Sequence, residues 1–128
     1  MMAEQNMQEF IKVLSSKAAV PGGGGACAYV AAAGMALGAM VANLTTGKKK
    51  YAQYQEEIEE LLSKAEQLSK ELMTYMDKDA ESFEPLSKAY GLPKDTKEQQ
   101  EYKEEVMEKA LKEASLTPVA LMEKILDA

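Results

Sequence analysis

The feature that most constrains the fold of this chain is the segment of residues 26–46, which contains no charged side chain. Alanine and glycine dominate the segment, and its length approaches the roughly 20 residues of a membrane span. Both residue types contribute little transfer free energy compared with leucine, and no aromatic belt marks both ends. We therefore expect a helix buried on all sides in a helical domain or at a dimer interface, where Gly34 and Gly38 would let a neighbouring helix approach closely.

The rest of the chain predicts an all-α, multi-helix bundle in a single domain, residues 1–128. A short amphipathic helix is expected near residues 4–16. The apolar spacing over residues 48–90 predicts one long helix, which Pro85 should bend or interrupt. A charged helix should follow the capping sequence that starts at Asp95, and a further helix should start at Thr117–Pro118.

Composition excludes several classes of function. The formal net charge of −6 opposes binding to phosphate backbones, so we expect no nucleic-acid partner. The chain has no histidine and a single cysteine, Cys27, so we expect no internal disulfide and no metal site. No secretory signal is visible at the amino terminus. Together these observations favour a cytoplasmic, water-soluble protein with no membrane partner.

One acidic residue lies among apolar ones on the predicted long helix. At about 100° per residue, Asp79 falls in the stripe that contains Met76 and Phe83, whereas Asp77 falls almost opposite, on the polar face. A carboxylate in an apolar stripe is costly to bury unless something pairs with it. The pattern leaves two readings open, a structural hydrogen bond or a carboxylate that performs acid–base chemistry in a cleft.

Two further segments could meet an anion. The glycine-rich turn Pro21–Gly25 precedes a helix and could present backbone N–H groups to a negative charge, or it could be a plain hinge. Lys48–Lys50 lie where a helix should begin, which is unfavourable for its dipole and hints at an anionic partner. A solvated basic surface explains any single lysine equally well. The charged stretch Lys94–Glu113 most simply forms a solvated helix face.

Taken in order, these motifs resemble those of the formiminotransferase-cyclodeaminase C-terminal family, which includes methenyltetrahydrofolate cyclohydrolases. The resemblance covers nearly the whole chain. It rests on Pro21-Gly22-Gly23-Gly24, the Ala/Gly-rich helix, Met40–Thr45, Gly47–Tyr51, Asp77–Phe83 and Leu92-Pro93-Lys94.

The resemblance implies an all-α, homodimeric folate enzyme without metal or cofactor. Its reactions would be hydrolysis of 5,10-methenyltetrahydrofolate to 10-formyltetrahydrofolate or cyclodeamination of 5-formiminotetrahydrofolate. Asp79 would be catalytic. The folate would be bound by Pro21, Gly22, Gly23, Gly24, Asn43, Lys48, Lys49, Lys50, Tyr51, Asp77 and Phe83.

Two departures from the family pattern bear on this expectation. Gly25 stands where the family usually has a serine, so any role of that hydroxyl is lost. The family domain also runs to roughly two hundred residues, so we expect this chain to lack its C-terminal third. Two alternatives therefore remain, a folate-binding relative without turnover and a structural helical module.

Overall fold

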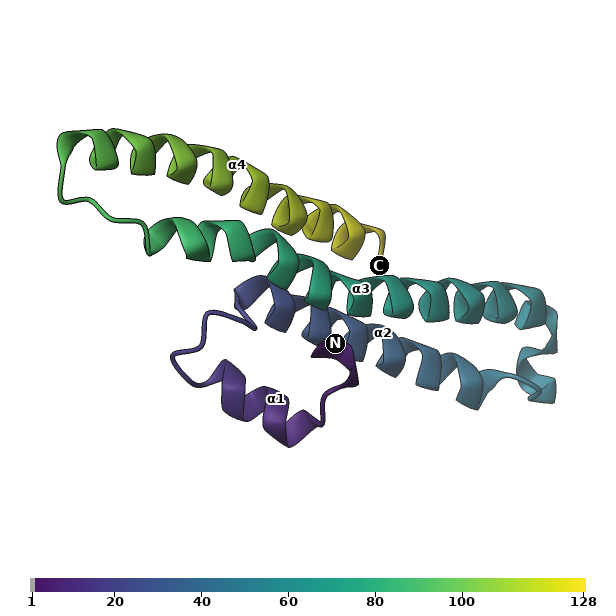
Figure 1. The fold of residues 1–128 in the computed structure, drawn as a ribbon. Helices are drawn as coiled ribbons and strands as arrows, with labels where there is room; N and C mark the ends of the chain where they lie inside the picture. The colour runs from purple at the N-terminus through teal and green to yellow at the C-terminus, as the bar shows by residue number, and fades with distance from the viewer. Residues whose placement is uncertain (1) are drawn as a thin grey trace.

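A computed structural model describes residues 2–128 of the chain, and it confirms the all-α prediction. The elements in chain order are η1 (Met2–Glu4), α1 (Met7–Leu14), α2 (Gly23–Thr45), η2 (Lys49–Tyr54), α3 (Gln55–Tyr90) and α4 (Lys97–Asp127). No strand occurs within residues 2–128. α2, α4, η1 and η2 pack against the longest helix, α3 (Figure 1).

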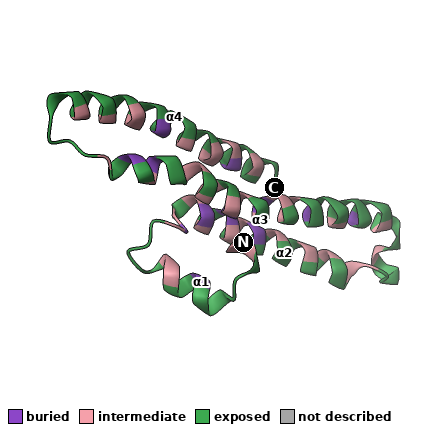
Figure 2. Ribbon diagram, in the orientation of Figure 1, coloured by how far each residue is buried: buried purple, intermediate pink, exposed green. Residues whose placement is uncertain are grey.

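The main core lies at the middle of α3, where residues of all four α-helices meet. Leu72 and Met76 of α3 are almost completely buried there, with 0% and 1% of their surface exposed. Burying such a side chain contributes roughly 1.5–3 kcal/mol. The other buried members of this cluster are Phe10, Ala28, Ala32 and Leu121. Figure 2 shows buried segments along the helices where they face one another, and most of the remaining ribbon is exposed.

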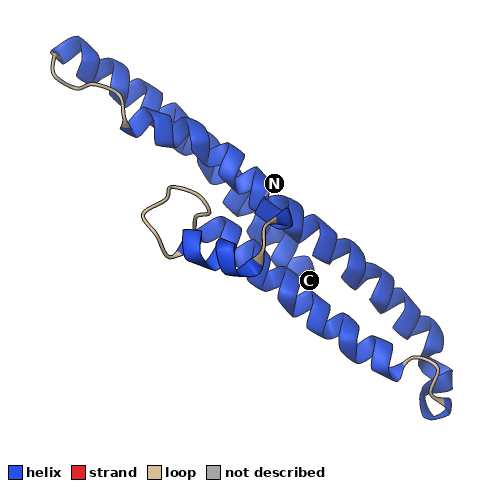
Figure 3. Cartoon of the chain, turned by 60° about the horizontal axis from the view of Figure 1, so that its bottom comes forward, coloured by secondary structure: helices blue, strands red, loops and turns tan. Residues whose placement is uncertain are grey.

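α2 and α4 cover different halves of α3. α2 lies along the amino-terminal half of α3, and Gly25 at the start of α2 lies beside Met76 of α3. α4 lies against the carboxyl-terminal half, where Leu86 and Ala89 pack on Ala110. As a result, η2 and the α3–α4 loop lie at opposite ends of an elongated molecule (Figure 3).

Within the described chain the Ala/Gly-rich helix is not buried on all sides, and its burial at a dimer interface stays a prediction. Only Gly25, Ala28 and Ala32 of α2 are buried. α2 packs lengthwise on α3 along one side alone, and no element within residues 2–128 covers its outer face. α2 is long and apolar enough to cross a membrane, with a mean hydropathy of 1.7.

Both internal prolines lie within continuous helices, so Pro85 does not interrupt α3. α3 runs through Pro85 and α4 runs through Pro118, so Thr117–Pro118 does not start a separate helix. A proline inside a helix costs about 3 kcal/mol because it removes a backbone donor and crowds the preceding turn. Packing beyond each proline offsets that cost, through Leu86 in α3 and Leu121 in α4.

Two helix starts also differ in detail. The cap of α4 is Thr96 rather than Asp95, and Gln99 completes the capping box. The first helix begins at Met7 behind the cap Asn6, because the Asn6 side chain accepts hydrogen bonds from Gln8 and Glu9. These corrections move boundaries and leave the helical assignment unchanged.

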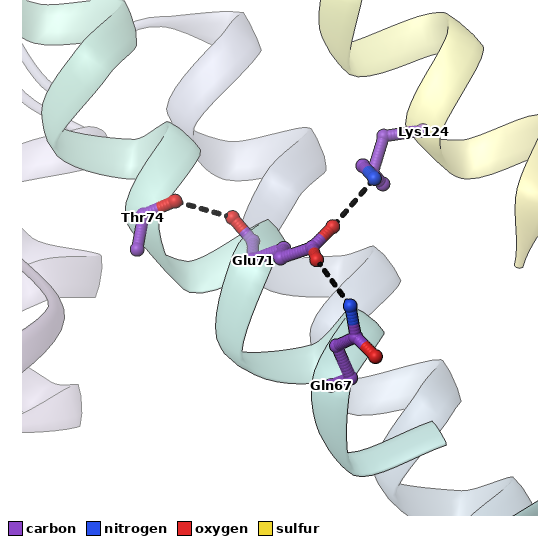
Figure 4. Close-up of polar contacts among 4 residues, drawn as sticks. All are labelled: Gln67, Glu71, Thr74 and Lys124. Carbon is purple, nitrogen blue, oxygen red and sulfur yellow. Dashed lines mark hydrogen bonds and ion pairs between the residues drawn. The ribbon is translucent and has the colours of Figure 1, made fainter. Parts of the chain in front are cut away.

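An ion pair joins the end of α4 to the middle of α3 (Figure 4). The Lys124 ammonium lies 2.5 Å from Oε2 of Glu71, and the other carboxylate oxygen, Oε1, accepts a hydrogen bond from the side-chain amide of Gln67. The hydrogen bond from Lys124, followed by that from Gln67, lowers the pKa of Glu71 below its ordinary value of 4.5. The pair therefore favours the docked position of α4 while Glu71 is ionised.

This ion pair predicts a specific pH dependence of stability. Because the folded-state pKa of Glu71 is lowered, its contribution is complete above the unfolded value and is lost as the pH falls through the folded value. As the pH falls from about 5 to about 3, we expect the free energy of unfolding to decrease less in Lys124→Met than in the wild type. Denaturant unfolding followed by circular dichroism measures the difference. Lys109→Met, on an exposed part of α4, is the control, and equal slopes for all three proteins would contradict the prediction.

Candidate active site at the amino-terminal end of α2

The carboxylate of Asp79 caps the amino-terminal end of α2. Its Oδ2 atom accepts a hydrogen bond from the backbone N–H of Gly25 at 3.1 Å. The helix start leaves several N–H groups without intrahelical partners, and the N-cap residue Gly22 supplies no side-chain bond. The glycine turn therefore does meet an anion, and in this structure that anion is the chain's own carboxylate. The position also favours a negative charge through the helix dipole.

The absence of a side chain at Gly24 lets the carboxylate approach the helix. A Cβ atom at Gly24 would lie 2.4 Å from Oδ1 of Asp79 and 2.6 Å from its Cγ, far inside van der Waals contact. A Cβ at Gly25 would instead lie 3.7 Å from Pro21 Cβ and 3.8 Å from the Met76 carbonyl, which is ordinary contact. Of these two glycines, Gly24 is the one that the geometry requires.

A cavity of about 500 Å³ opens beside this contact. Its walls come from the glycine turn, from α3 through Asp79 and Phe83, and from α4 through Ser115 and Pro118. The volume lies within the roughly 300–1,000 Å³ typical of small-molecule sites, and the walls are largely apolar, as such sites require. Asp79 is half-buried, so its carboxylate reaches the cavity without being fully removed from water.

The α4 wall of this cavity was not identified from the sequence. From the sequence, we interpreted the stretch up to Glu113 as a solvated helix face and Thr117–Pro118 as the start of a new helix. In the structure, the Ser82 and Thr117 hydroxyls share a short hydrogen bond between α3 and α4, next to the cavity. One sequence feature could have predicted this wall. The residues on both sides of Pro118 keep the apolar spacing of a helix, and such spacing is compatible with one continuous, packed helix.

Asp77 lies away from the cavity and is not on an open polar face. Its Oδ1 atom accepts a hydrogen bond from the backbone N–H of Met2 at 2.8 Å, and its Oδ2 atom is buried without a hydrogen-bond partner in the described chain. The expectation of an exposed Asp77 is wrong because η1 folds back over α3. Asp77 thus holds the amino-terminal segment, whereas Asp79 holds α2.

The remaining predicted site residues lie at the other end of α2. Asn43 is exposed on its last turn, and Lys48, Lys49 and Lys50 are exposed around the start of η2. The Lys50 ammonium lies 5.5 Å from the centroid of the Tyr51 ring. At 1.5 Å per residue, the length of α2 separates this group from the glycine turn by about 33 Å. One chain therefore brings together Pro21, Gly22, Gly23, Gly24, Asp79 and Phe83, and leaves the lysine end apart.

Comparisons with known proteins identify related sequences over nearly the whole chain. Residues 6–128 match the family model described as formiminotransferase-cyclodeaminase. Methenyltetrahydrofolate cyclohydrolase of Methylorubrum extorquens is 40% identical over 120 residues, which are 94% of this chain and 58% of that protein. Formimidoyltransferase-cyclodeaminase of Sus scrofa is 32% identical over 119 residues, which are 93% of this chain and 22% of that protein.

A solved structure shares the fold. The crystal structure of formiminotetrahydrofolate cyclodeaminase from Thermotoga maritima superimposes with a TM-score of 0.78 and 30% sequence identity. The match covers 97% of this chain and 58% of that one. The chain therefore spans between about a fifth and three fifths of the length of these relatives.

The glycine turn yields a prediction with a matched control. We expect Gly24→Ala to displace the Asp79 carboxylate and break its bond to Gly25, a net loss of about 1.5–3 kcal/mol for a hydrogen bond to a charged group. Gly25→Ala keeps the backbone N–H, has room for its methyl group and should unfold no earlier than the wild type. Thermal unfolding of both variants gives the comparison. A Gly24→Ala variant as stable as Gly25→Ala would show that the carboxylate does not need this close approach.

Proposed function

From the finding that this chain belongs to the formiminotransferase-cyclodeaminase family, we propose that it binds a tetrahydrofolate derivative in the cavity beside Asp79. We propose further that it hydrolyses 5,10-methenyltetrahydrofolate to 10-formyltetrahydrofolate. The observation that carries the proposal is the half-buried Asp79 carboxylate, anchored through Oδ2 and lining a cavity of about 500 Å³. The cavity's apolar walls suit a reduced pterin ring, and Phe83 offers an aromatic surface.

The anchored carboxylate has the features that this reaction requires. The hydrogen bond from Gly25 holds Oδ2, and within residues 2–128 no donor bonds Oδ1. Oδ1 is therefore the oxygen that accepts a proton from the attacking water. The methenyl carbon carries delocalised positive charge, so the ionised carboxylate also stabilises the bound cation before the attack. Because the carbon is already electrophilic, the proposal calls for no metal or other cofactor.

The proposed steps balance in atoms and charge. Water adds to the methenyl carbon, a C–O bond forms, and Asp79 takes the released proton. The new hydroxyl then loses its proton as the bond from carbon to N5 breaks and N5 gains a proton, which leaves a formyl group on N10. One water is consumed, and one proton is released to solvent when Asp79 returns to its ionised form.

Cyclodeamination of 5-formiminotetrahydrofolate is the second candidate. The Thermotoga maritima structure and the Sus scrofa relative carry that activity in their names. In that reaction Asp79 would protonate the departing ammonia. We favour hydrolysis because the relative that is 40% identical is named for it and matches 94% of this chain.

The proposal places the protein in the cytoplasm rather than in a bilayer. α2 has the length and the hydropathy of a membrane-spanning helix. It lies, however, along α3, which carries exposed charges such as Glu60 and Lys64. Insertion of α2 would require it to leave α3 or to carry those charges into hydrocarbon, which is costly. Its exposed apolar face is instead suited to a second copy of the chain.

The proposal predicts a specific effect of Asp79→Asn. Loss of a general base typically costs 10²–10⁴-fold, so we expect turnover of methenyltetrahydrofolate to fall at least about 100-fold. The loss of methenyl absorbance measures the rate. Glu66→Gln, an exposed carboxylate on the same helix, is the matched control and should keep the wild-type rate.

Binding of 5-formyltetrahydrofolate to the wild type, measured by calorimetry, separates the alternatives. Binding without turnover of either folate substrate would identify a folate-binding relative, and absence of binding would identify a structural module. A wild-type rate in Asp79→Asn would rule out the role assigned to this carboxylate.

A further inference from the structure

α4 carries a proline in the wall of the cavity beside Asp79, and Ala114 and Pro118 both line that cavity. In an α-helix each carbonyl accepts a hydrogen bond from the N–H four residues later, and proline has no N–H. The Ala114 carbonyl therefore lacks its usual helical donor. The proline thus frees a hydrogen-bond acceptor at the wall of the cavity.

The freed carbonyl lies where a ligand can reach it. A helix carbonyl points toward the carboxyl end of its own helix, so that of Ala114 points along the wall toward the Pro118 ring. The ring crowds this carbonyl, and crowding tilts a helix carbonyl away from the axis. Because Ala114 and Pro118 both line the cavity, this tilt is toward the cavity.

The next residue along α4 supplies a second acceptor. Ser115 also lines the cavity, and its hydroxyl donates a hydrogen bond to the Lys112 carbonyl at 2.7 Å. A serine hydroxyl has one hydrogen and two lone pairs, so with its hydrogen committed the oxygen can only accept. The α4 wall thus presents two acceptors from adjacent residues, the Ala114 carbonyl oxygen and Ser115 Oγ, which we call the α4 acceptor pair.

A chain of two hydrogen bonds fixes this wall relative to Asp79. Ser82 of α3 donates its single hydroxyl hydrogen to the Lys78 carbonyl at 2.7 Å, so it can only accept from Thr117 of α4. Thr117 directly precedes Pro118 in α4. Lys78 and Ser82 lie on either side of Asp79 in α3. The α4 acceptor pair is therefore tied to the helix segment that carries the carboxylate.

We propose that the α4 acceptor pair binds the pyrimidine edge of the pterin ring and thereby directs the bridging carbon of the folate toward Asp79. This edge carries two neighbouring donors, the 2-amino group and the N3–H, which match two neighbouring acceptors. Small-molecule sites are mostly apolar and fix the orientation of a ligand through a few such polar groups. The choice of a pterin rests on the proposed function, whereas the acceptor pair itself follows from Pro118 and the Ser115 hydrogen bond.

The charge of the cavity supports this orientation. Among the described residues that line it, Asp79 carries the only charged side chain. The carboxylate and the α4 acceptor pair all accept hydrogen bonds, so the cavity favours a group that donates N–H bonds and carries positive charge. It disfavours anionic groups such as the glutamate tail, because their oxygens would face acceptors without a donor between them. The ring end of the folate is therefore the end that enters.

Pro118→Ala tests the freed carbonyl. Alanine restores the backbone N–H at position 118, which would pair with the Ala114 carbonyl inside the helix. We expect a higher midpoint of thermal unfolding, because the helix gains a hydrogen bond and loses a crowded ring. We also expect roughly 3- to 10-fold weaker binding of 5-formyltetrahydrofolate by calorimetry, the loss of one hydrogen bond. Pro85→Ala, in α3 and outside the cavity wall, is the matched control and should gain stability with unchanged affinity.

A modified ligand separates hydrogen bonding from the shape of the cavity. The 2-desamino-2-methyl analogue of 5-formyltetrahydrofolate lacks one of the two donors at the pyrimidine edge. The wild type should bind it roughly 3- to 10-fold more weakly than the parent compound. Pro118→Ala and Ser115→Ala should each reduce this discrimination, as coupled partners do in a double-mutant cycle. Ser63→Ala, an exposed serine of α3 outside the cavity wall, is the control for Ser115→Ala and should discriminate as the wild type does.

Three outcomes would overturn the inference. Wild-type affinity in both Pro118→Ala and Ser115→Ala would show that neither acceptor contacts the ligand. Weaker binding with unchanged discrimination between the two compounds would show that α4 acts through the shape of the cavity alone. Absence of binding to the wild type would remove the folate site together with the acceptor pair. Neither compound contains the methenyl bridge, so a failure of hydrolysis alone would contradict the proposed reaction and not the assignment of this edge.

Discussion

The hydrogen bond between Asp79 and the start of α2 is the contact on which the arrangement of the molecule depends. It joins the first turn of one long helix to the middle of another and fixes where α2 begins along α3. Glycine at the N-cap leaves α2 without a local cap, and glycine at position 24 leaves room for a distant one. The glycine turn and the aspartate are thus one structural unit, although 54 residues separate the bonded groups in the sequence. The same unit forms a wall of the candidate active site, so the group assigned to chemistry also maintains the fold.

That double role explains why the two sequence readings of Asp79 were hard to separate. A structural hydrogen bond and a reactive carboxylate looked like alternatives, yet the geometry combines them on different oxygen atoms. Oδ2 makes the bond to Gly25, while Oδ1 is left for a ligand. An anchored carboxylate keeps its orientation when a substrate enters, which reduces the reorganisation needed during reaction. The cost is that replacing Asp79 affects stability as well as any chemistry.

Residue spacing along the sequence predicted the helices. It failed at the positions whose structure depends on packing between helices. Apolar spacing placed Leu72 and Met76 in the core, and the glycine turn and Asp79 proved to be adjacent. Local reasoning could not foresee that packing beyond Pro118 would keep α4 continuous, so it missed the α4 wall of the cavity. It also placed Asp77 on an open face, because helix geometry alone does not show that η1 folds back over it. The dimer and the ligand-binding residues stay predictions.

The exposed apolar face of α2 follows from the way the helix packs within the chain. A helix rich in alanine and glycine can be approached closely on two sides, and here α3 occupies one side only. We propose that the other side belongs to a second copy of the chain, so that α2 buries its remaining apolar face. The lack of charge over residues 26–46, which resembles a membrane span, is in this account the requirement for packing between two surfaces of protein.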